Sequence, residues 1–421
     1  MIKIGSLTIK YTHLMLGVLI TALVIFEASN PGDFKVFTEA AKLLKHHENM
    51  YDRWLNGNSC KYYYSPFFAL LLTPFTSVPD FVISIVWLSA NVFFFARIWK
   101  ITTAFFDFNG FSKKESRAFT LLTIFLTFRF LLHNFEMAQM NVYVMWSILE
   151  SLNLFEKNKN MQGALLFALA MNIKILPIVF LPYLIMRGRF AAFTWIALFS
   201  VAFLYIPSLF LGIEYNNFLL SHWFHTINPF NTEHNIDTQL GGHSLTSLIP
   251  PLLMQTDGEL PLKRNIANLD LATVNIIVST IRAALIVLTL YFTGLSFFKK
   301  AKSTIHRLWE VSYILLIIPL IFPHQEKYAF FLIFPATAYI IYFLIRTRQS
   351  NWSAFSKRTW IILVSILSVS FVLNTVTTDL FIGKYLKDVC QHYKTITYGT
   401  FLLVLILPFC KPLVLQKERE A

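Results

Sequence analysis

Charged residues are scarce in this sequence. Only 14% of its 421 residues are charged, while 56% are hydrophobic and 16% are aromatic. A soluble domain carries roughly a quarter charged residues, so this is the composition of a membrane protein, and membrane lipids are its expected surroundings. The formal charge is +13, but the cations stand in short clusters between apolar runs. That pattern is typical of cytoplasmic loops and argues against a nucleic-acid partner.

Several chemical signatures are also missing. The three cysteines, Cys60, Cys390 and Cys410, show no CxxC or other metal-ligand spacing. A disulfide could join Cys60 to Cys390, although we expect both to remain thiols. No D-x-D or paired acid stands near the first loop, which argues against a metal-dependent nucleotide-sugar enzyme. We expect neither a metal nor a cofactor.

The apolar runs predict an all-α polytopic membrane protein with about 12 transmembrane helices. Each run is judged by whether it can cross about 30 Å of hydrocarbon, and Lys and Arg set the orientation. The first helix is expected to be retained, because no A-x-A cleavage site follows it. The predicted spans are 11–28, 80–99, 117–134, 141–156, 161–174, 175–187, 190–211, 270–298, 308–322, 328–346, 359–378 and 395–411.

The loops predict a single integral membrane domain over residues 1–421 with both termini cytoplasmic. The outer first loop, 29–79, would contain juxtamembrane helices, including the segment 65–77, which is too short to span. A second outer loop covers 212–268, and 380–394 also faces outward. We expect a multi-pass protein of the inner (plasma) membrane with its active site on the outer face.

Asp33 is the candidate catalytic residue. It lies a few residues past the end of the first predicted helix and opens an amphipathic segment. A single ionised carboxylate beside a lipid surface suits a general base that removes a proton from a sugar hydroxyl. The alternative is an ordinary helix cap or a solvated loop acid.

Lys174 is the first candidate ligand for a donor phosphate. It stands with Pro177 at the junction of two short predicted spans, which indicates broken helices meeting at a polar site. An ionisable residue inside a membrane is costly and therefore a functional candidate. A lysine whose ammonium snorkels to the interface is the alternative.

Four further cations are candidates for the same role. Arg129 and His133 are four residues apart and so share one helical face, although Glu136 could simply pair with either. His324 and Lys327 lie in a short polar loop, 322–328, between two apolar spans. Such a loop has the composition of the rim of a site.

Uncharged polar residues are the candidates for contact with the sugar or the acceptor. Gln139 and Asn141 stand at the mouth of a predicted helix, where they could bind a sugar hydroxyl or merely cap the helix. Tyr64 belongs to a run of three tyrosines that could stack on a sugar or form an interfacial aromatic belt. His243 is one of several outer-loop histidines whose spacings are unlike any zinc signature, so an acceptor contact is expected instead.

The order of these features resembles glycosyltransferase family 87, over residues 10–350. Ala138 stands where the family has glycine, Gly242-His243 where it has Asn-Gln, and the tryptophan of its late loop is missing. The elements that carry the resemblance are Asp33, Asn49-Met50-Tyr51-Asp52, Tyr64-Ser65-Pro66-Phe67, Ala138-Gln139-Met140-Asn141, Ala168 to Pro177, Arg187-Gly188-Arg189, Gly242-His243-Ser244-Leu245 and Pro323-His324.

The resemblance implies a C-type glycosyltransferase fold and a polyprenyl-phosphate sugar donor. It implies that Asp33 is the base, that membrane-facing cations bind the lipid phosphate, and that transfer inverts the anomeric carbon without a metal. A hexose, with mannose favoured, would pass to a lipid, glycan or protein acceptor.

Two alternatives stay open. One is a ligase or polymerase that uses lipid pyrophosphate donors, which the long loop 212–268 would suit. The other is a transporter or lipid flippase, although no internal repeat with paired interrupted helices is found.

Overall fold

The computed structural model describes residues 2–4, 7–9, 11–57, 60–229, 231–294, 303–349 and 356–412. The regular secondary structure of this part of the chain is helical except for a short antiparallel hairpin of β1 (Ile2–Ile4) and β2 (Leu7–Ile9) and two isolated bridges. The end of the predicted span 270–298 and the predicted cytoplasmic C-terminus beyond residue 412 lie outside the described residues.

Seven helical segments of the described chain are long and apolar enough to cross a membrane. They are α4 (Asp80–Thr103), α5 (Lys113–Glu136), α9 (Phe190–Tyr205) continued by α10 (Ser208–Leu211), α13 (Leu271–Thr293), α14 (Thr304–Ile321), η4 (Lys327–Ile333) continued by α15 (Phe334–Gln349), and α16 (Lys357–Phe371) continued by the π-helical turn η5 (Val372–Val376). The expectation of a helical polytopic membrane protein is confirmed.

The other five expected spans fall on helices outside this set, so the number twelve stays a prediction. These helices are α1 (Tyr11–Ala28), α6 (Asn141–Glu156), α7 (Asn160–Ile173), η2 (Leu176–Val179) followed by α8 (Phe180–Met186), and α18 (Thr395–Ile406) followed by η6 (Leu407–Phe409).

Local sequence signals begin and end several of these helices. The Ser112 hydroxyl accepts a hydrogen bond from the Glu115 backbone N–H (3.2 Å), and the Glu115 carboxylate accepts one from the Ser112 N–H (2.8 Å). This capping box starts α5. Asp270 caps α13 through the Thr273 N–H, and the left-handed Gly294 ends it. These contacts satisfy backbone groups that a helix end leaves open.

The core of the bundle is the pair α14 and α15. In the apolar window of η4 with α15, 94% of residues are buried inside the protein, and in that of α14, 72%. The corresponding windows of α4, α13 and α16 are 22% or less buried, although they are about as apolar as the η4–α15 window and more apolar than that of α14. The position of a helix in the bundle, and not its composition, therefore decides whether it is buried. The outer helices present their apolar side chains to lipid.

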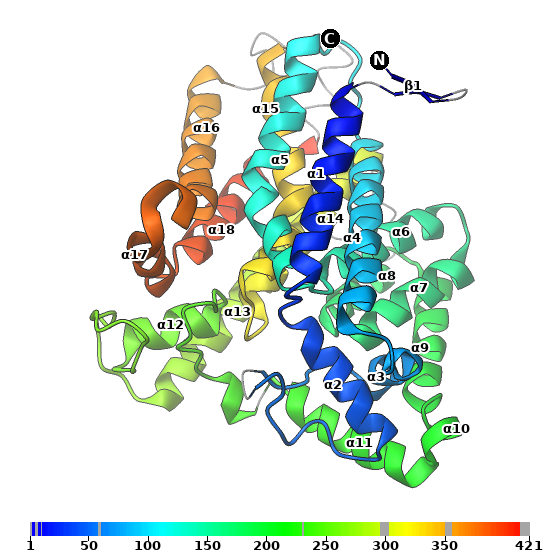
Figure 1. Cartoon of the computed structure of the whole chain (residues 1–421). Helices are drawn as coiled ribbons and strands as arrows, with labels where there is room; N and C mark the ends of the chain where they lie inside the picture. The colour runs from blue at the N-terminus through cyan, green and yellow to red at the C-terminus, as the bar shows by residue number, and fades with distance from the viewer. Residues whose placement is uncertain are drawn as a thin grey trace.

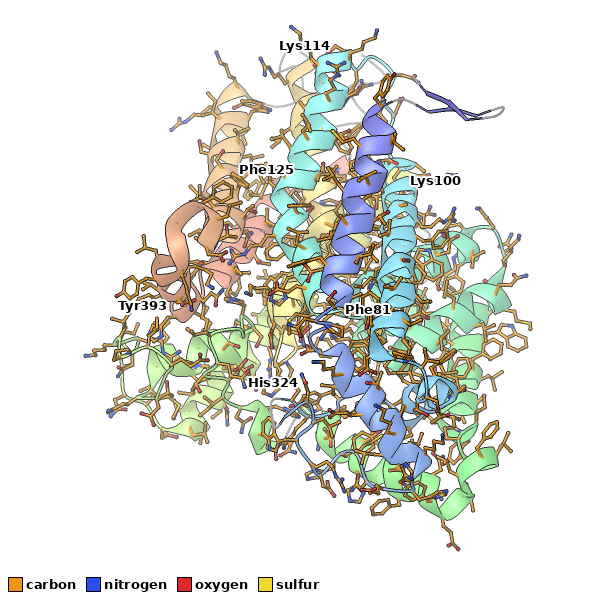
Figure 2. The ribbon with its side chains drawn as sticks, viewed as in Figure 1. Phe81, Lys100, Lys114, Phe125, His324 and Tyr393 are labelled. Carbon is orange, nitrogen blue, oxygen red and sulfur yellow. The ribbon has the colours of Figure 1, made fainter. Side chains whose placement is uncertain are left out.

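Short helices gather at one end of the bundle, opposite the N-terminal hairpin (Figure 1). There they form the segments that the sequence places in the outer loops. They are α2 (Phe34–Lys45), α3 (Pro66–Leu72), η1 (Thr73–Phe75), α11 (Ile213–Ile227), η3 (Thr232–His234), α12 (Leu245–Leu253) and α17 (Asp379–His392). Figure 2 shows Lys100 and Lys114 towards the opposite end of the long helices from His324.

Candidate active site

The candidate site lies where the ends of several helices meet. Residues that are far apart in sequence come together there: the α1–α2 junction, the α5–α6 turn, the end of α7, and the loop between α14 and η4. Gly32 allows the close approach. It has φ of 41°, and a Cβ at that position would lie 2.8 Å from the Met137 Cα.

Asp33 occupies the N-cap position of α2, but its side chain makes no capping hydrogen bond. Its Oδ2 instead accepts a hydrogen bond from Gln139 Nε2 at 2.6 Å. The Cys60 thiol, which is not joined to Cys390, lies 3.8 Å from Oδ1. The interpretation of Asp33 as a helix cap is therefore wrong, since the carboxylate is directed at the α5–α6 turn.

The environment of Asp33 has opposing effects on its acidity. Asp33 is partly buried, and the loss of solvent around its carboxyl raises its pKa above the ordinary value. The Gln139 hydrogen bond, the Lys174 charge and the Cys60 thiol act in the other direction, but burial has the largest effect. A raised pKa makes this carboxylate a stronger base than an exposed aspartate.

Gln139 joins two of the candidate residues. Its side-chain amide donates to Asp33, and its Oε1 accepts a hydrogen bond from the Tyr64 hydroxyl at 3.2 Å. Both Gln139 and Tyr64 are more than 90% buried. Gln139 therefore fixes the orientation of the Asp33 carboxylate rather than capping α6.

Lys174 lies on the other side of this cluster. The helix α7 ends at Ile173, Lys174 is extended, and η2 begins at Leu176. Lys174 Nζ donates to Asn141 Oδ1 at 3.0 Å and lies 5.2 Å from the centre of the Tyr328 ring. The ammonium group turns into the polar cluster, which does not fit a lysine that snorkels to the interface.

Glu326 is a site residue that the sequence reasoning missed. Burial and the charges of Asp33 and Asp237 raise its pKa from 4.5 to about 7, against the opposing charges of Lys327 and Lys174. The available signal is the polar loop 322–328, in which the cations His324 and Lys327 draw attention away from this acid. Glu326 brings a second titratable carboxyl to the vicinity of Asp33.

His243 supports this loop through its backbone. Its N–H donates to the Gln325 carbonyl at 2.8 Å, and Gly242 forms an isolated bridge with Glu326. The His243 ring is fully buried against Phe330, and neither ring nitrogen has a hydrogen-bond partner among the described residues. The expected contact with an acceptor stays a prediction.

His324 belongs to a neighbouring cluster. Its ring stacks on Tyr63, with centroids 6.0 Å apart, and its Nε2 lies 2.9 Å from His234 Nδ1. Its Nδ1 lies 4.0 Å from Asp237 Oδ2. These described contacts of His324 are with Tyr63, His234 and Asp237, and its role at the donor phosphate stays a prediction.

The remaining cations have other surroundings. Arg129 donates to the Asn374 carbonyl (2.9 Å) and the Thr377 hydroxyl (2.8 Å), so it ties α5 to the π-helical turn η5. His133 is buried, with its ring 5.7 Å from that of Tyr328. Lys327 is half-buried at the first residue of η4. Within the described chain, the exposed Glu136 forms no ion pair with Arg129 or His133, so that pairing is wrong.

The chemistry-bearing groups that meet here are a carboxylate, an amide, an ammonium group and a second carboxyl. No three His, Cys, Asp or Glu side chains in the described ranges are grouped so that they could hold a metal ion. A carboxylate beside an ammonium group can accept a proton while the cation stabilises a negative charge that develops nearby.

A sequence model of glycosyltransferase family 87 matches residues 62–299, more than half of the chain. The chain belongs to this family. It is therefore a membrane glycosyltransferase, with a sugar donor and an acceptor as its partners. A search of curated proteins found no match.

The family-87 match is narrower than the stretch 10–350 over which the motifs resemble the family. Gln139, Asn141, Lys174 and His243 lie inside it. Asp33 precedes the matched range, and the loop 322–328 follows it. The tertiary structure brings these outlying segments to the matched residues.

Proposed function

We propose that this family-87 glycosyltransferase moves a hexose, with mannose favoured, from a polyprenyl-phosphate donor to an acceptor hydroxyl. The acceptor is a lipid, a glycan or a protein, and transfer takes place on the outer face of the inner membrane. The reaction needs no metal and inverts the anomeric carbon. Both chain termini lie on the cytoplasmic side.

The observation that carries this proposal is the orientation of Asp33. It stands where a helix would use a capping aspartate, yet its Oδ2 is bound by Gln139 and its Oδ1 faces only a thiol in the described contacts. An oxygen that accepts one weak bond can accept a proton as well. Family membership favours group transfer over transport as the use of such a carboxylate.

In the proposed reaction, Asp33 takes the proton from the acceptor hydroxyl. The acceptor oxygen then bonds to the anomeric carbon, and the bond between that carbon and the donor phosphate oxygen breaks. The leaving polyprenyl phosphate gains the negative charge. A preorganised cation at that point can supply several kcal/mol of stabilisation.

Lys174 is the favoured cation for the donor phosphate. Its ammonium group lies in the cluster that holds Asp33, and one of its hydrogen bonds goes to the neutral Asn141, which a charged phosphate oxygen can replace. Lys327 and His133, near Tyr328, are further candidates. Tyr64, Gln139, Asn141 and His243 are the candidates for the sugar and acceptor.

Asp33→Asn tests the base directly. The asparagine oxygen can still accept from Gln139, so the site keeps its geometry but loses the proton acceptor. We expect turnover to fall by roughly a hundred- to ten-thousand-fold. Donor binding should survive, because the carboxylate acts on the acceptor. The measurement is transfer from radiolabelled polyprenyl-phosphate mannose by the purified protein.

Asp52→Asn is the matched control. Asp52 lies in the same loop, with its side chain 64% exposed, and it pairs with His222 at 3.2 Å. This variant should transfer sugar at the wild-type rate. An Asp33→Asn protein that also keeps a near wild-type rate would remove Asp33 from the mechanism.

A further inference from the structure

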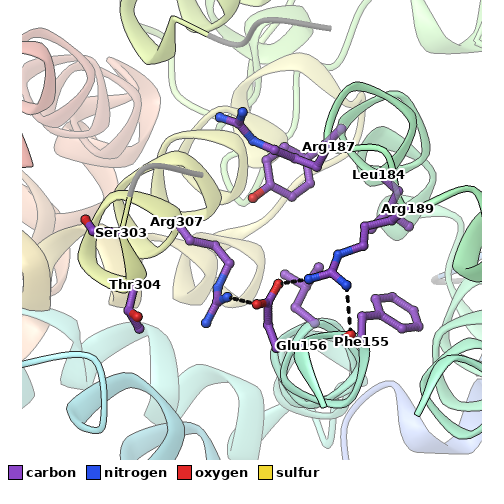
Figure 3. A pocket seen from close by; sticks show the side chains of 10 residues that line it. Phe155, Glu156, Leu184, Arg187, Arg189, Ser303, Thr304 and Arg307 are labelled. Atoms are coloured by element: carbon purple, nitrogen blue, oxygen red, sulfur yellow. Dashed lines mark hydrogen bonds and ion pairs between the residues drawn. The ribbon is translucent and has the colours of Figure 1, made fainter. Parts of the chain in front are cut away.

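A cavity of about 230 Å³, lined in part by charged side chains, lies at the other end of the helices that build the candidate active site. It is bounded by the end of α6, the α8–α9 turn and the start of α14 (Figure 3). Asn141 begins α6 and Glu156 ends it, so the two sites are about 22 Å apart along this helix. Arg307, which lines the cavity, stands 5.3 Å from the Phe105 ring just beyond the end of α4.

Three arginines line this cavity: Arg187, Arg189 and Arg307. Figure 3 shows Arg189 and Arg307 reaching the same carboxylate, Glu156, from two sides. Arg307 Nη1 lies 2.5 Å from that carboxylate, and Arg189 also donates to the Phe155 carbonyl at 3.0 Å. One negative charge is thus shared between two guanidinium groups.

The third arginine has a carboxylate of its own. Arg187 Nε donates to Glu310 at 3.0 Å, and Glu310 also accepts a hydrogen bond from the Tyr183 hydroxyl at 3.1 Å. His306 Nε2 lies 2.9 Å from the same carboxylate. Three guanidinium groups therefore face two carboxylates, and the cavity keeps a surplus of one positive charge before His306 is counted.

The start of α14 adds hydrogen-bond donors to this wall. Ser303 and Thr304 line the cavity, and the Ser303 side chain accepts from the His306 backbone N–H at 3.2 Å. The first turn of a helix carries backbone N–H groups and a partial positive charge that favour an anion. The cavity thus combines a surplus guanidinium group, two hydroxyls and a helix N-terminus.

We propose that this cavity binds a phosphate group, either as inorganic phosphate or as the headgroup of a phospholipid. Guanidinium groups bind phosphate oxygens through paired charge-assisted hydrogen bonds. A phosphate would engage Arg307 and Arg189, which now share Glu156, together with the Ser303 and Thr304 hydroxyls. This site is separate from the proposed donor-phosphate site near Lys174. The proposal does not depend on the proposed transfer reaction.

The proposal predicts opposite effects of two variants on phosphate binding. Arg307→Gln removes the surplus charge and leaves Glu156 paired with Arg189, so phosphate should bind about tenfold or more weakly. Glu156→Gln releases both guanidinium groups, so phosphate should bind more tightly than in the wild type. Arg53→Gln is the control, because Arg53 pairs with Glu48 in an exposed ion pair outside the cavity and should not alter binding.

Binding of inorganic phosphate to the full chain in detergent is measured by calorimetry. The second arm uses nanodiscs of phosphatidylcholine with and without phosphatidic acid, and follows the apparent melting temperature. Competition between phosphatidic acid and inorganic phosphate identifies a headgroup site, whereas binding of phosphate alone identifies a soluble anion. Either result supports the proposal if Arg307→Gln weakens binding of the phosphate group.

The proposal is overturned if the wild type binds neither probe, or if Glu156→Gln fails to tighten binding. In that case the arginines only hold α6, α8, α9 and α14 together. If Arg307→Gln does not fold, the sign of the Glu156→Gln effect decides by itself.

Discussion

Replacing Glu326 by glutamine should flatten the pH dependence of stability between about pH 4.5 and pH 7. In the folded protein, burial and two neighbouring acids raise the Glu326 pKa from 4.5 to about 7. The folded state therefore binds this proton more tightly than the unfolded state does. The stability that it contributes is complete below about pH 4.5 and is lost as the pH rises through about 7.

The size of the effect follows from the two pKa values. A difference of about 2.5 between them, at about 1.4 kcal/mol per pH unit, corresponds to at most about 3.5 kcal/mol. The side chain is only partly exposed, so solvent reduces this value modestly. Glutamine has no charged form, so Glu326→Gln should gain stability over the wild type at pH 8 and not at pH 4.

The assay is the apparent melting temperature of detergent-purified wild type and Glu326→Gln at intervals from pH 4 to pH 8. The difference between the two curves isolates Glu326 from other titrating groups. Glu214→Gln, an exposed acid on α11, is the control and should show no such difference. Parallel wild-type and Glu326→Gln curves across the whole range would show that Glu326 is ionised at an ordinary pH and that the reasoning is wrong.

Two further comparisons test how the site is built. Gly242→Ala should destabilise the protein by about 1–3 kcal/mol, since its Cβ would lie 2.0 Å from Asp237 Oδ2 and 2.6 Å from Ser247 Oγ. A Cβ at Gly241 would lie 3.4 Å from Glu326, so Gly241→Ala should have the melting temperature of the wild type. Equal melting temperatures for the two alanine variants would contradict this packing. Arg129→Gln should lower the melting temperature but leave the donor KM unchanged, because Arg129 holds Asn374 and Thr377. Lys174→Ala should raise the donor KM, and a reversed pattern in donor titrations would make Arg129 the phosphate ligand.

Much of the candidate site is visible in the sequence because polar groups stand out in apolar surroundings. Lys174 at a helix break and Asp33 after the first helix are costly to place near hydrocarbon. This cost marks each of them as a functional candidate from the sequence alone. Gln139 and Asn141 are noticeable for the same reason. Glu326 has no such contrast, because it lies in a loop that is polar throughout.

Other contacts join residues that are distant in sequence, so the sequence alone does not reveal them. Arg187 and Arg189 read simply as a basic turn after a helix. Their carboxylate partners, Glu310 and Glu156, are more than 30 residues away, and nothing in the local pattern indicates them. The sequence offers Glu136 as a partner for Arg129, and the contacts with Asn374 and Thr377 become visible only when η5 is placed beside α5.

The sequence by itself determined that this is a helical membrane protein, and its motif order determined the family. Both follow from the length and composition of apolar runs and from residue types in order, which are properties of the chain. The tertiary structure alone decided which helices are buried, since α15 and α13 are similarly apolar but only α15 lies inside. It also decided that the Asp33 carboxylate meets Gln139 and that Glu326 titrates near neutral pH. Burial and Coulomb interactions depend on distances in space, and those distances exist only once the helix ends have come together.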